Sequence, residues 1–284
     1  MGPDEYHETV DDSAYTNTLA RWNIGRALEV CALLRTRWPE RWQELRTRLA
    51  LDVSELALWD EVIATLVTGF NPATGIIDQF TGFFDLEFID LAKFPDRTTP
   101  MDVQLGHERV ARSQIVKQAD VVALLGLLPD EFDESVKLTN FRTYEPRCGH
   151  GSSLSRSMHA LVAARLGEEA TAYRYLLETA QIDLSANAIE SEGGVHIAAL
   201  GGLWQAVVLG FGGVSMSGEK LRIAPRLPKQ WHGLAFRLCW QGRRILVHIL
   251  ADGRVVTTLE SGDELSVIVH GEERLLRPLA HALA

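Results

Sequence analysis

The chain has 284 residues, of which 46% are hydrophobic and 23% are charged. This composition is typical of a globular protein and excludes disordered and fibrous classes. The length allows one large domain or two smaller ones. Asp and Glu number 38 against 28 Lys and Arg, giving a net charge of −10. A chain with this charge repels polyanions, so we expect no nucleic-acid partner.

Three cysteines, Cys31, Cys148 and Cys239, are present. Their odd number and irregular spacing indicate reduced thiols and neither a disulfide framework nor a zinc site. The N-terminus lacks the basic start and apolar run of a signal peptide, and no stretch reaches 18 apolar residues. We therefore expect a cytoplasmic protein with no membrane partner and no metal.

Apolar residues recur at three- and four-residue steps from Ser13 to about Thr36, which predicts a long helix. Residues 69–105 lack helical periodicity and read as a long loop, and loops of this length are usually functional. Further helical patterns cover 39–49, 54–66 with Ser54 as N-cap, 108–127, 130–138, 152–166, 168–181 and 196–209.

After Gly213 the pattern changes to short β-branched runs separated by turn signals such as Gln241-Gly and Asp252-Gly. We predict a mainly α chain with a C-terminal β domain: a partial (α/α)6 barrel over residues 1–212, then a small antiparallel β-sandwich over residues 213–284.

The opening segment Gly2-Pro-Asp-Glu-Tyr-His-Glu crowds several carboxylates ahead of a helix. Crowding raises the pKa of a carboxyl group, as a general acid at neutral pH requires. A structural alternative is that Asp11, Asp12 and Ser13 cap the helix while Asp4 and Glu5 are solvated. The His-Glu pair does not continue to a second zinc-binding His.

Two glycine-containing turns precede predicted helices and offer hydroxyl, amide and imidazole groups to an anion. One is Gly149-His-Gly-Ser-Ser-Leu-Ser, which is neither a P-loop nor a serine-hydrolase elbow, and the other is Glu192-Gly-Gly-Val-His. Either turn can equally be an ordinary helix start. Lys117 and Gln118, in the predicted helix 108–127, could donate hydrogen bonds to sugar hydroxyls or simply lie at the surface.

In combination, these segments resemble glycoside hydrolase family 65, the family of the maltose, kojibiose, nigerose and trehalose phosphorylases. The motifs that carry the resemblance occur in family order and span nearly the whole chain. They are Gly2-Pro-Asp-Glu-Tyr-His-Glu with Ala14-Tyr-Thr-Asn, Val116-Lys-Gln-Ala-Asp, Tyr144-Glu-Pro with His150-x-Ser-Ser-Leu-Ser, and Glu192-Gly-Gly-Val-His with Gly201-Gly202.

The resemblance implies inverting phosphorolysis of an α-linked glucosyl disaccharide to β-glucose 1-phosphate and an acceptor sugar. Glu5 matches the general acid, and Lys117 and Gln118 match residues that hold the glucosyl unit. Ser152, Ser153 and His196 match the phosphate pocket. Disaccharide and inorganic phosphate are then the partners, no cofactor beyond phosphate is expected, and a homodimer is implied because relatives are commonly dimers.

The acid motif begins at residue 5, whereas relatives are expected to carry a β-sandwich and half of the barrel before it. We therefore expect a C-terminal portion whose activity depends on the missing half. Two alternatives stay open: a family hydrolase with Glu145, Glu190 or Glu192 as base, and a non-catalytic remnant or interaction subunit.

Overall fold

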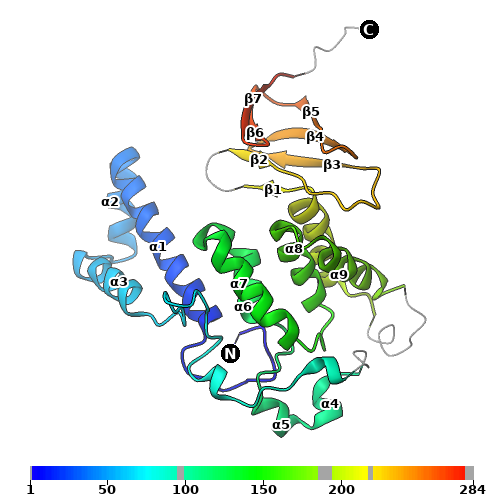
Figure 1. The fold of residues 1–284 in the computed structure, drawn as a ribbon. Helices are drawn as coiled ribbons and strands as arrows, with labels where there is room; N and C mark the ends of the chain where they lie inside the picture. The colour runs from blue at the N-terminus through cyan, green and yellow to red at the C-terminus, as the bar shows by residue number, and fades with distance from the viewer. Residues whose placement is uncertain (1, 95–98, 185–193, 217–219, 279–284) are drawn as a thin grey trace. The chain divides into compact units, whose positions relative to one another are not determined.

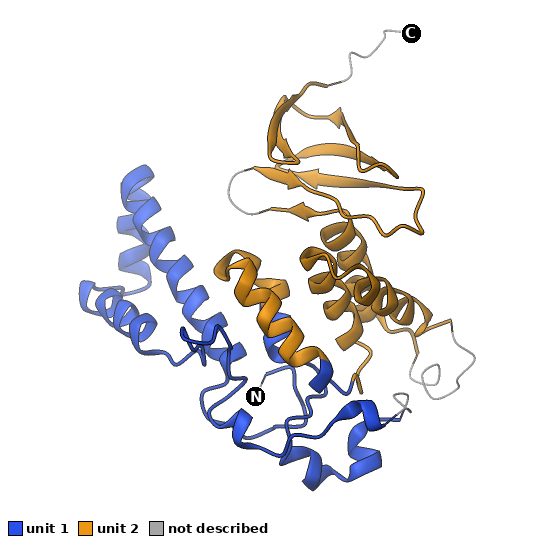
Figure 2. Cartoon of the chain, viewed as in Figure 1, with its two compact units in different colours: residues 1–124, 146–149 blue, residues 125–145, 150–284 orange. Residues whose placement is uncertain are grey.

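A computed structural model describes residues 2–94, 99–184, 194–216 and 220–278 (Figure 1). The chain divides into two compact units, residues 1–124 with 146–149 and residues 125–145 with 150–284 (Figure 2). The predicted boundary between residues 212 and 213 stays a prediction. No helix in the described ranges combines the length and apolar character needed to cross a membrane.

Unit 1 consists of helices and irregular segments. Ser13 caps the longest helix by accepting the backbone N–H of Thr16, as the sequence indicated. Asp52, and not the predicted Ser54, caps the third helix, because its carboxylate accepts the backbone N–H of Glu55 at 2.8 Å. The elements are α1 (Ala14–Arg37), α2 (Pro39–Arg48), α3 (Val53–Thr65), η1 (Phe83–Asp85), η2 (Leu91–Lys93), α4 (Met101–Leu105), α5 (His107–Ala111) and α6 (Asp120–Leu127), whose last residues enter unit 2.

The continuous helix predicted over 108–127 is wrong. Residues 112–119 separate α5 from α6, and their backbone forms long-range hydrogen bonds in place of helical ones. Gln114 N–H donates to Glu87 O at 2.9 Å and Val116 N–H to Arg147 O at 3.0 Å. Tertiary partners therefore override the local apolar periodicity, and Lys117 lies on an extended segment.

Unit 2 begins with helices that pack on one another. They are η3 (Pro129–Glu131), α7 (Glu134–Tyr144), η4 (Glu145–Arg147, shared with unit 1), α8 (Ser155–Leu166), α9 (Glu169–Gln181), α11 (Ile197–Gln205) and the π-helix η5 (Ala206–Phe211). Helix α8 is the centre of this group, since all residues from His159 to Ala164 are buried.

The C-terminal β region has two sheets, and the predicted mainly α fold with a C-terminal β domain is confirmed. Sheet order is β1-β2-β6-β7 and β3-β4-β5. All pairs are antiparallel except β2 with β6, a parallel pair that the sequence did not predict. The strands are β1 (Val214–Ser215), β2 (Leu221–Ile223), β3 (Gly233–Trp240), β4 (Arg243–Leu250), β5 (Val255–Ser261), β6 (Leu265–Val269) and β7 (Glu272–Leu276).

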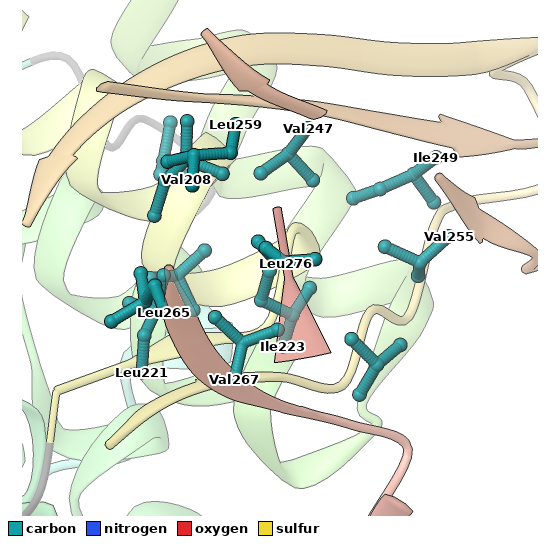
Figure 3. Close-up of a cluster of buried hydrophobic side chains, with 13 residues drawn as sticks. Val208, Leu221, Ile223, Val247, Ile249, Val255, Leu259, Leu265, Val267 and Leu276 are labelled. Atoms are coloured by element: carbon teal, nitrogen blue, oxygen red, sulfur yellow. The ribbon is translucent and has the colours of Figure 1, made fainter. Parts of the chain in front are cut away.

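One buried cluster joins the two sheets. Ile223 and Val267 from the first sheet lie among Val247 and Leu259 from the second, each at most 1% exposed (Figure 3). Val208 of η5 joins the same cluster, which ties the helices of unit 2 to the β region. The β3–β4 turn follows its sequence signal, because Gln241 and Gly242 both have the positive φ of a tight hairpin turn.

Candidate active site

Asp4 is the centre of a buried hydrogen-bond network in unit 1. Its side chain is 2% exposed. Oδ1 accepts the backbone N–H groups of Tyr6 at 3.2 Å and Lys117 at 2.8 Å. Oδ2 accepts Nε2–H of Gln79 at 2.9 Å and lies 2.7 Å from His7 Nδ1. These four bonds match the acceptor capacity of a carboxylate, so Asp4 is a structural hub and not a solvated residue.

His7 fixes the same network from its other ring nitrogen. Nε2 lies 2.9 Å from the carbonyl oxygen of Ser113, which can only accept, so Nε2 carries a proton. The ring packs at a tilted angle against Phe80 and edge-to-face against Phe83, with centroids 5.0 and 6.1 Å away. His7 therefore ties the opening segment to the extended segment that carries Lys117.

Glu5 and Lys117 meet at the surface of this network. Their side chains form an ion pair between Oε2 of Glu5 and Nζ of Lys117. The Glu5 side chain is 56% exposed and that of Lys117 27% exposed, so both groups are accessible to a ligand. Gln118, the next residue, is half-buried. The structure thus brings together the carboxylate and the ammonium that the sequence analysis had selected separately.

Asp120 shows the carboxylate crowding that we expected within the opening segment. It begins α6 and accepts the backbone N–H of Asp4 on Oδ1 at 2.7 Å. Burial, followed by the negative charge of Asp4, raises the pKa of Asp120 to about 7. A side chain at Gly2 would collide with the Asp120 carboxylate, which explains the glycine.

Gln79 and Asp120 were not predicted from the sequence to belong to the site. Asp120 was the last residue of the Val116-Lys-Gln-Ala-Asp motif, and that was its only signal. Gln79 lies in the 69–105 segment, whose unusual length was the only sign in the sequence that it could contribute to a site.

In unit 2, the serine turn precedes the buried helix α8. Oγ of Ser152 accepts the backbone N–H of Leu154 at 3.3 Å, and Ser153 is half-buried. His150, just before the turn, has a positive φ of 52° and is 7% exposed. Positive φ is rare for a residue with a side chain, so strong contacts must hold His150 in place.

Those contacts form a chain of hydrogen bonds. Tyr175 donates its hydroxyl to Glu145 Oε1 at 2.7 Å and accepts Nε2–H of His150 at 2.8 Å. His150 Nδ1 then accepts the hydroxyl of Ser155 at 2.9 Å. Burial, with the charge of Glu145, raises the pKa of Tyr175, which keeps the phenol protonated as a donor.

His196 begins α11 and is held by Asp183, a partner that the sequence analysis missed. Its backbone N–H donates to Asp183 Oδ2 at 3.1 Å, and its Nδ1 lies 2.7 Å from Asp183 Oδ1. These hydrogen bonds lower the pKa of Asp183. The ring directs Nε2 away from this carboxylate, so Nε2 is the atom that could meet an anion.

The predicted residues thus form two groups. Glu5, Lys117 and Gln118 belong to unit 1, while Ser152, Ser153 and His196 belong to unit 2. Glu190 and Glu192, two of the alternative bases, lie outside the described residues. The third alternative base, Glu145, accepts the hydroxyl hydrogen of Tyr175 on Oε1. The same oxygen lies 3.2 Å from Nη2 of Arg174.

Two family models match the chain. Residues 1–205 match the glycosyl hydrolase family 65 central catalytic domain, and residues 214–276 match the family 65 C-terminal domain.

The curated relatives include kojibiose phosphorylases and a 1,2-alpha-glucosylglycerol phosphorylase. The kojibiose phosphorylase of Halothermothrix orenii is 38% identical over 95% of this chain and 35% of its own length. The kojibiose phosphorylase of Caldanaerobacter subterraneus subsp. tengcongensis is 34% identical over 97% of this chain and 36% of its own length. The 1,2-alpha-glucosylglycerol phosphorylase of Bacillus selenitireducens is 36% identical over 97% of this chain and 37% of its own length. The chain spans about a third of the length of these relatives.

A solved structure of a kojibiose-phosphorylase-like protein from the human microbiome superposes with a TM-score of 0.87 at 26% identity. The superposition covers 98% of this chain and 38% of the microbiome protein.

Proposed function

Because the chain belongs to glycoside hydrolase family 65, we propose that it supplies the acid and phosphate-binding groups for phosphorolysis of an α-linked glucosyl disaccharide. The products are β-glucose 1-phosphate and the acceptor sugar. The observation that carries the proposal is the Glu5–Lys117 ion pair, which sets an accessible carboxylate beside a cation on a buried Asp4 framework.

In the proposed reaction, Glu5 donates its proton to the glycosidic oxygen while a phosphate oxygen attacks the glucosyl C1 from the opposite face. The bond from C1 to the glycosidic oxygen breaks as the bond to phosphate forms, so the configuration inverts. Phosphate is already anionic and needs no second carboxylate as base, unlike the water of an inverting hydrolase.

The remaining residues have binding roles in this proposal. Lys117 has three N–H donors, so its ammonium can contact Glu5 and still donate to sugar hydroxyls, with Gln118 beside it. Ser152 and Ser153 offer hydroxyl groups to phosphate at the start of α8, and His196 offers Nε2 at the start of α11. Asp183 supports this role by fixing the other ring nitrogen of His196.

The hydrolase alternative is less well supported. Its one described base, Glu145, accepts hydrogen bonds from Tyr175 and Arg174 and would have to break both to activate water.

The experiment uses the 284-residue chain alone and a chimera in which it replaces the matching third of the Halothermothrix orenii enzyme. Each is incubated with α-linked disaccharides with and without inorganic phosphate, and β-glucose 1-phosphate and free glucose are measured. We expect phosphate-dependent β-glucose 1-phosphate in the chimera and its loss, by about a hundredfold or more, in Glu5→Gln. Glu8→Gln, an exposed neighbour, is the matched control.

Three outcomes would count against the proposal. Unchanged turnover in Glu5→Gln refutes the acid assignment, and phosphate-independent glucose release supports the hydrolase. A folded chimera without any turnover supports the non-catalytic alternative.

A further inference from the structure

A cavity of about 250 Å³ lies within unit 2. Its wall is formed by α6, η3, α7, α8, η5, β1 and the residues that follow β2. The charged lining residues are Asp130, Glu134, Lys137, Arg165 and Arg226. Ser152, Ser153 and His196 do not line it. Its volume is near the lower end of the range for small-molecule sites.

Arg165 is a half-buried cation that forms no ion pair with any carboxylate in the described ranges. It lies in the last turn of α8 and donates Nη1–H to Gly126 O at 2.9 Å and Nε–H to Leu209 O at 3.4 Å. A guanidinium has five N–H donors, so others remain for a ligand. Burial lowers the pKa of Arg165, and the negative charge of Asp130 opposes this shift although the two side chains form no ion pair.

Arg226 contributes a second guanidinium to the wall. Its Nη1 donates to the backbone carbonyl of Arg165, and no described carboxylate forms an ion pair with it. Lys137 differs, because it is neutralised by Glu134 at 2.6 Å. The wall of the cavity therefore carries two guanidinium groups and one carboxylate, Asp130, that forms no ion pair with the residues that the structure describes. Arg165 is half-buried and Arg226 is exposed, so the cavity opens to solvent with an excess of positive charge on its wall. A concave wall with this charge attracts a small anion.

We propose that this cavity binds the phosphate group of a small phosphorylated, hydroxyl-bearing molecule. Arg165 and Arg226 are the phosphate ligands, since guanidinium groups match phosphate oxygens in bidentate geometry. Asp130 accepts hydroxyl hydrogens from the rest of the ligand and disfavours a second phosphate. The site is separate from the phosphate pocket of the proposed reaction and does not depend on it.

A purely structural role is the competing explanation. Both arginines donate to carbonyl groups near helix C-termini, where cations are stabilising. That role accounts for the hydrogen bonds present, and it predicts a loss of stability upon substitution without any effect of phosphate compounds.

The test measures binding by isothermal titration calorimetry with inorganic phosphate, glucose 1-phosphate and glucose. All titrations use the 284-residue chain carrying Ser152→Ala, Ser153→Ala and His196→Ala, which removes the other predicted phosphate groups. Into this background we introduce Arg226→Gln or Arg165→Lys. Arg237→Gln, an exposed arginine of β3 outside the cavity, is the matched control.

We expect the background protein to bind a phosphate compound, with the affinity lowered about tenfold by Arg226→Gln and unchanged by Arg237→Gln. Tighter binding of glucose 1-phosphate than of inorganic phosphate identifies a phosphomonoester site, and equal binding a site for the free ion. Either result supports the shared phosphate chemistry.

Absence of phosphate binding in the folded background protein would overturn the proposal, as would binding of glucose alone. So would equal affinity in Arg226→Gln and the control. Circular dichroism shows whether Arg165→Lys folds. If it does not fold, the result for Arg226→Gln tests the proposal, because the Arg226 side chain is exposed and its replacement leaves the fold intact. Failure of this site leaves the Glu5 experiment untouched.

Discussion

The carboxylate of Asp4 accepts the backbone N–H of Lys117 at 2.8 Å, across 113 residues of sequence. This bond places the residue after Asp4 next to the side chain of Lys117, which is how Glu5 and Lys117 come to form an ion pair. The buried aspartate thereby determines the position of the proposed acid without lying at the surface itself.

Replacing Asp4 should therefore disturb both stability and the Glu5–Lys117 geometry. In Asp4→Asn, one side-chain oxygen becomes an N–H₂ group facing donors, and the negative charge beside His7 is lost. We expect a loss of about 3 kcal/mol in the free energy of unfolding, measured by urea denaturation. Asp11→Asn changes an exposed carboxylate of the same loop and should cost less than about 0.5 kcal/mol. Equal losses in the two variants would contradict the hub role of Asp4.

The raised pKa of Asp120 predicts a pH-dependent stability. The pKa of about 7 in the folded state exceeds the value of 3.8 of a free aspartate side chain, so the folded state favours the protonated carboxyl. The stabilising contribution is complete below about pH 4 and is lost as pH rises through about 7. Relative to Asp120→Asn, the wild-type chain should lose at most about 4 kcal/mol over this window.

Urea denaturation at several pH values from 4 to 8 measures this difference. Asp60→Asn, on the exposed face of α3, should give a curve parallel to wild type. A parallel curve for Asp120→Asn as well would show that Asp120 does not titrate in this range.

Tyr175→Phe should release His150 from its strained conformation. The change removes one hydroxyl that both accepts from His150 and donates to Glu145, so each of these side chains loses one hydrogen bond. We expect a loss of about 2 kcal/mol in stability and shifted amide resonances for residues 150–155. Tyr173→Phe, on the same helix and without a hydroxyl partner in the described residues, is the control and should change neither. Unchanged resonances in Tyr175→Phe would contradict the relay.

Val267→Ala tests the cluster that joins the two sheets. Val267 is 0% exposed between them, so truncation removes buried methyl groups and leaves a cavity. We expect a loss of about 2 kcal/mol by thermal or urea unfolding. Val256→Ala, on β5 with 52% of its surface exposed, should cost much less. Similar costs would indicate that the sheets do not share a packed core.

Local signals alone predicted several elements well. The Ser13 cap with its following periodicity located α1, and Gln241-Gly located a hairpin turn, because both structures depend on bonds between near neighbours. The opening motif also selected Glu5 as a candidate acid, which stays a prediction, and the resemblance to family 65 gave the family that the comparisons show.

Other features were decided by tertiary contacts. The apolar periodicity at 108–127 predicted one helix, yet the backbone around Lys117 is extended because its N–H groups find partners far away in the chain. Asp183, the partner of His196, lies in a segment without any distinguishing pattern. The pairing of β2 with β6 is likewise invisible to local propensity.

The sequence by itself thus determined which chemical groups this protein carries and which family it belongs to, since each motif and each helix cap consists of residues that are close together in the sequence. Only the tertiary structure decided which carboxylate is buried, which one faces solvent, and which partners hold each histidine. Burial and long-range hydrogen bonding depend on residues far apart in the chain, and they set the positions of the groups described here.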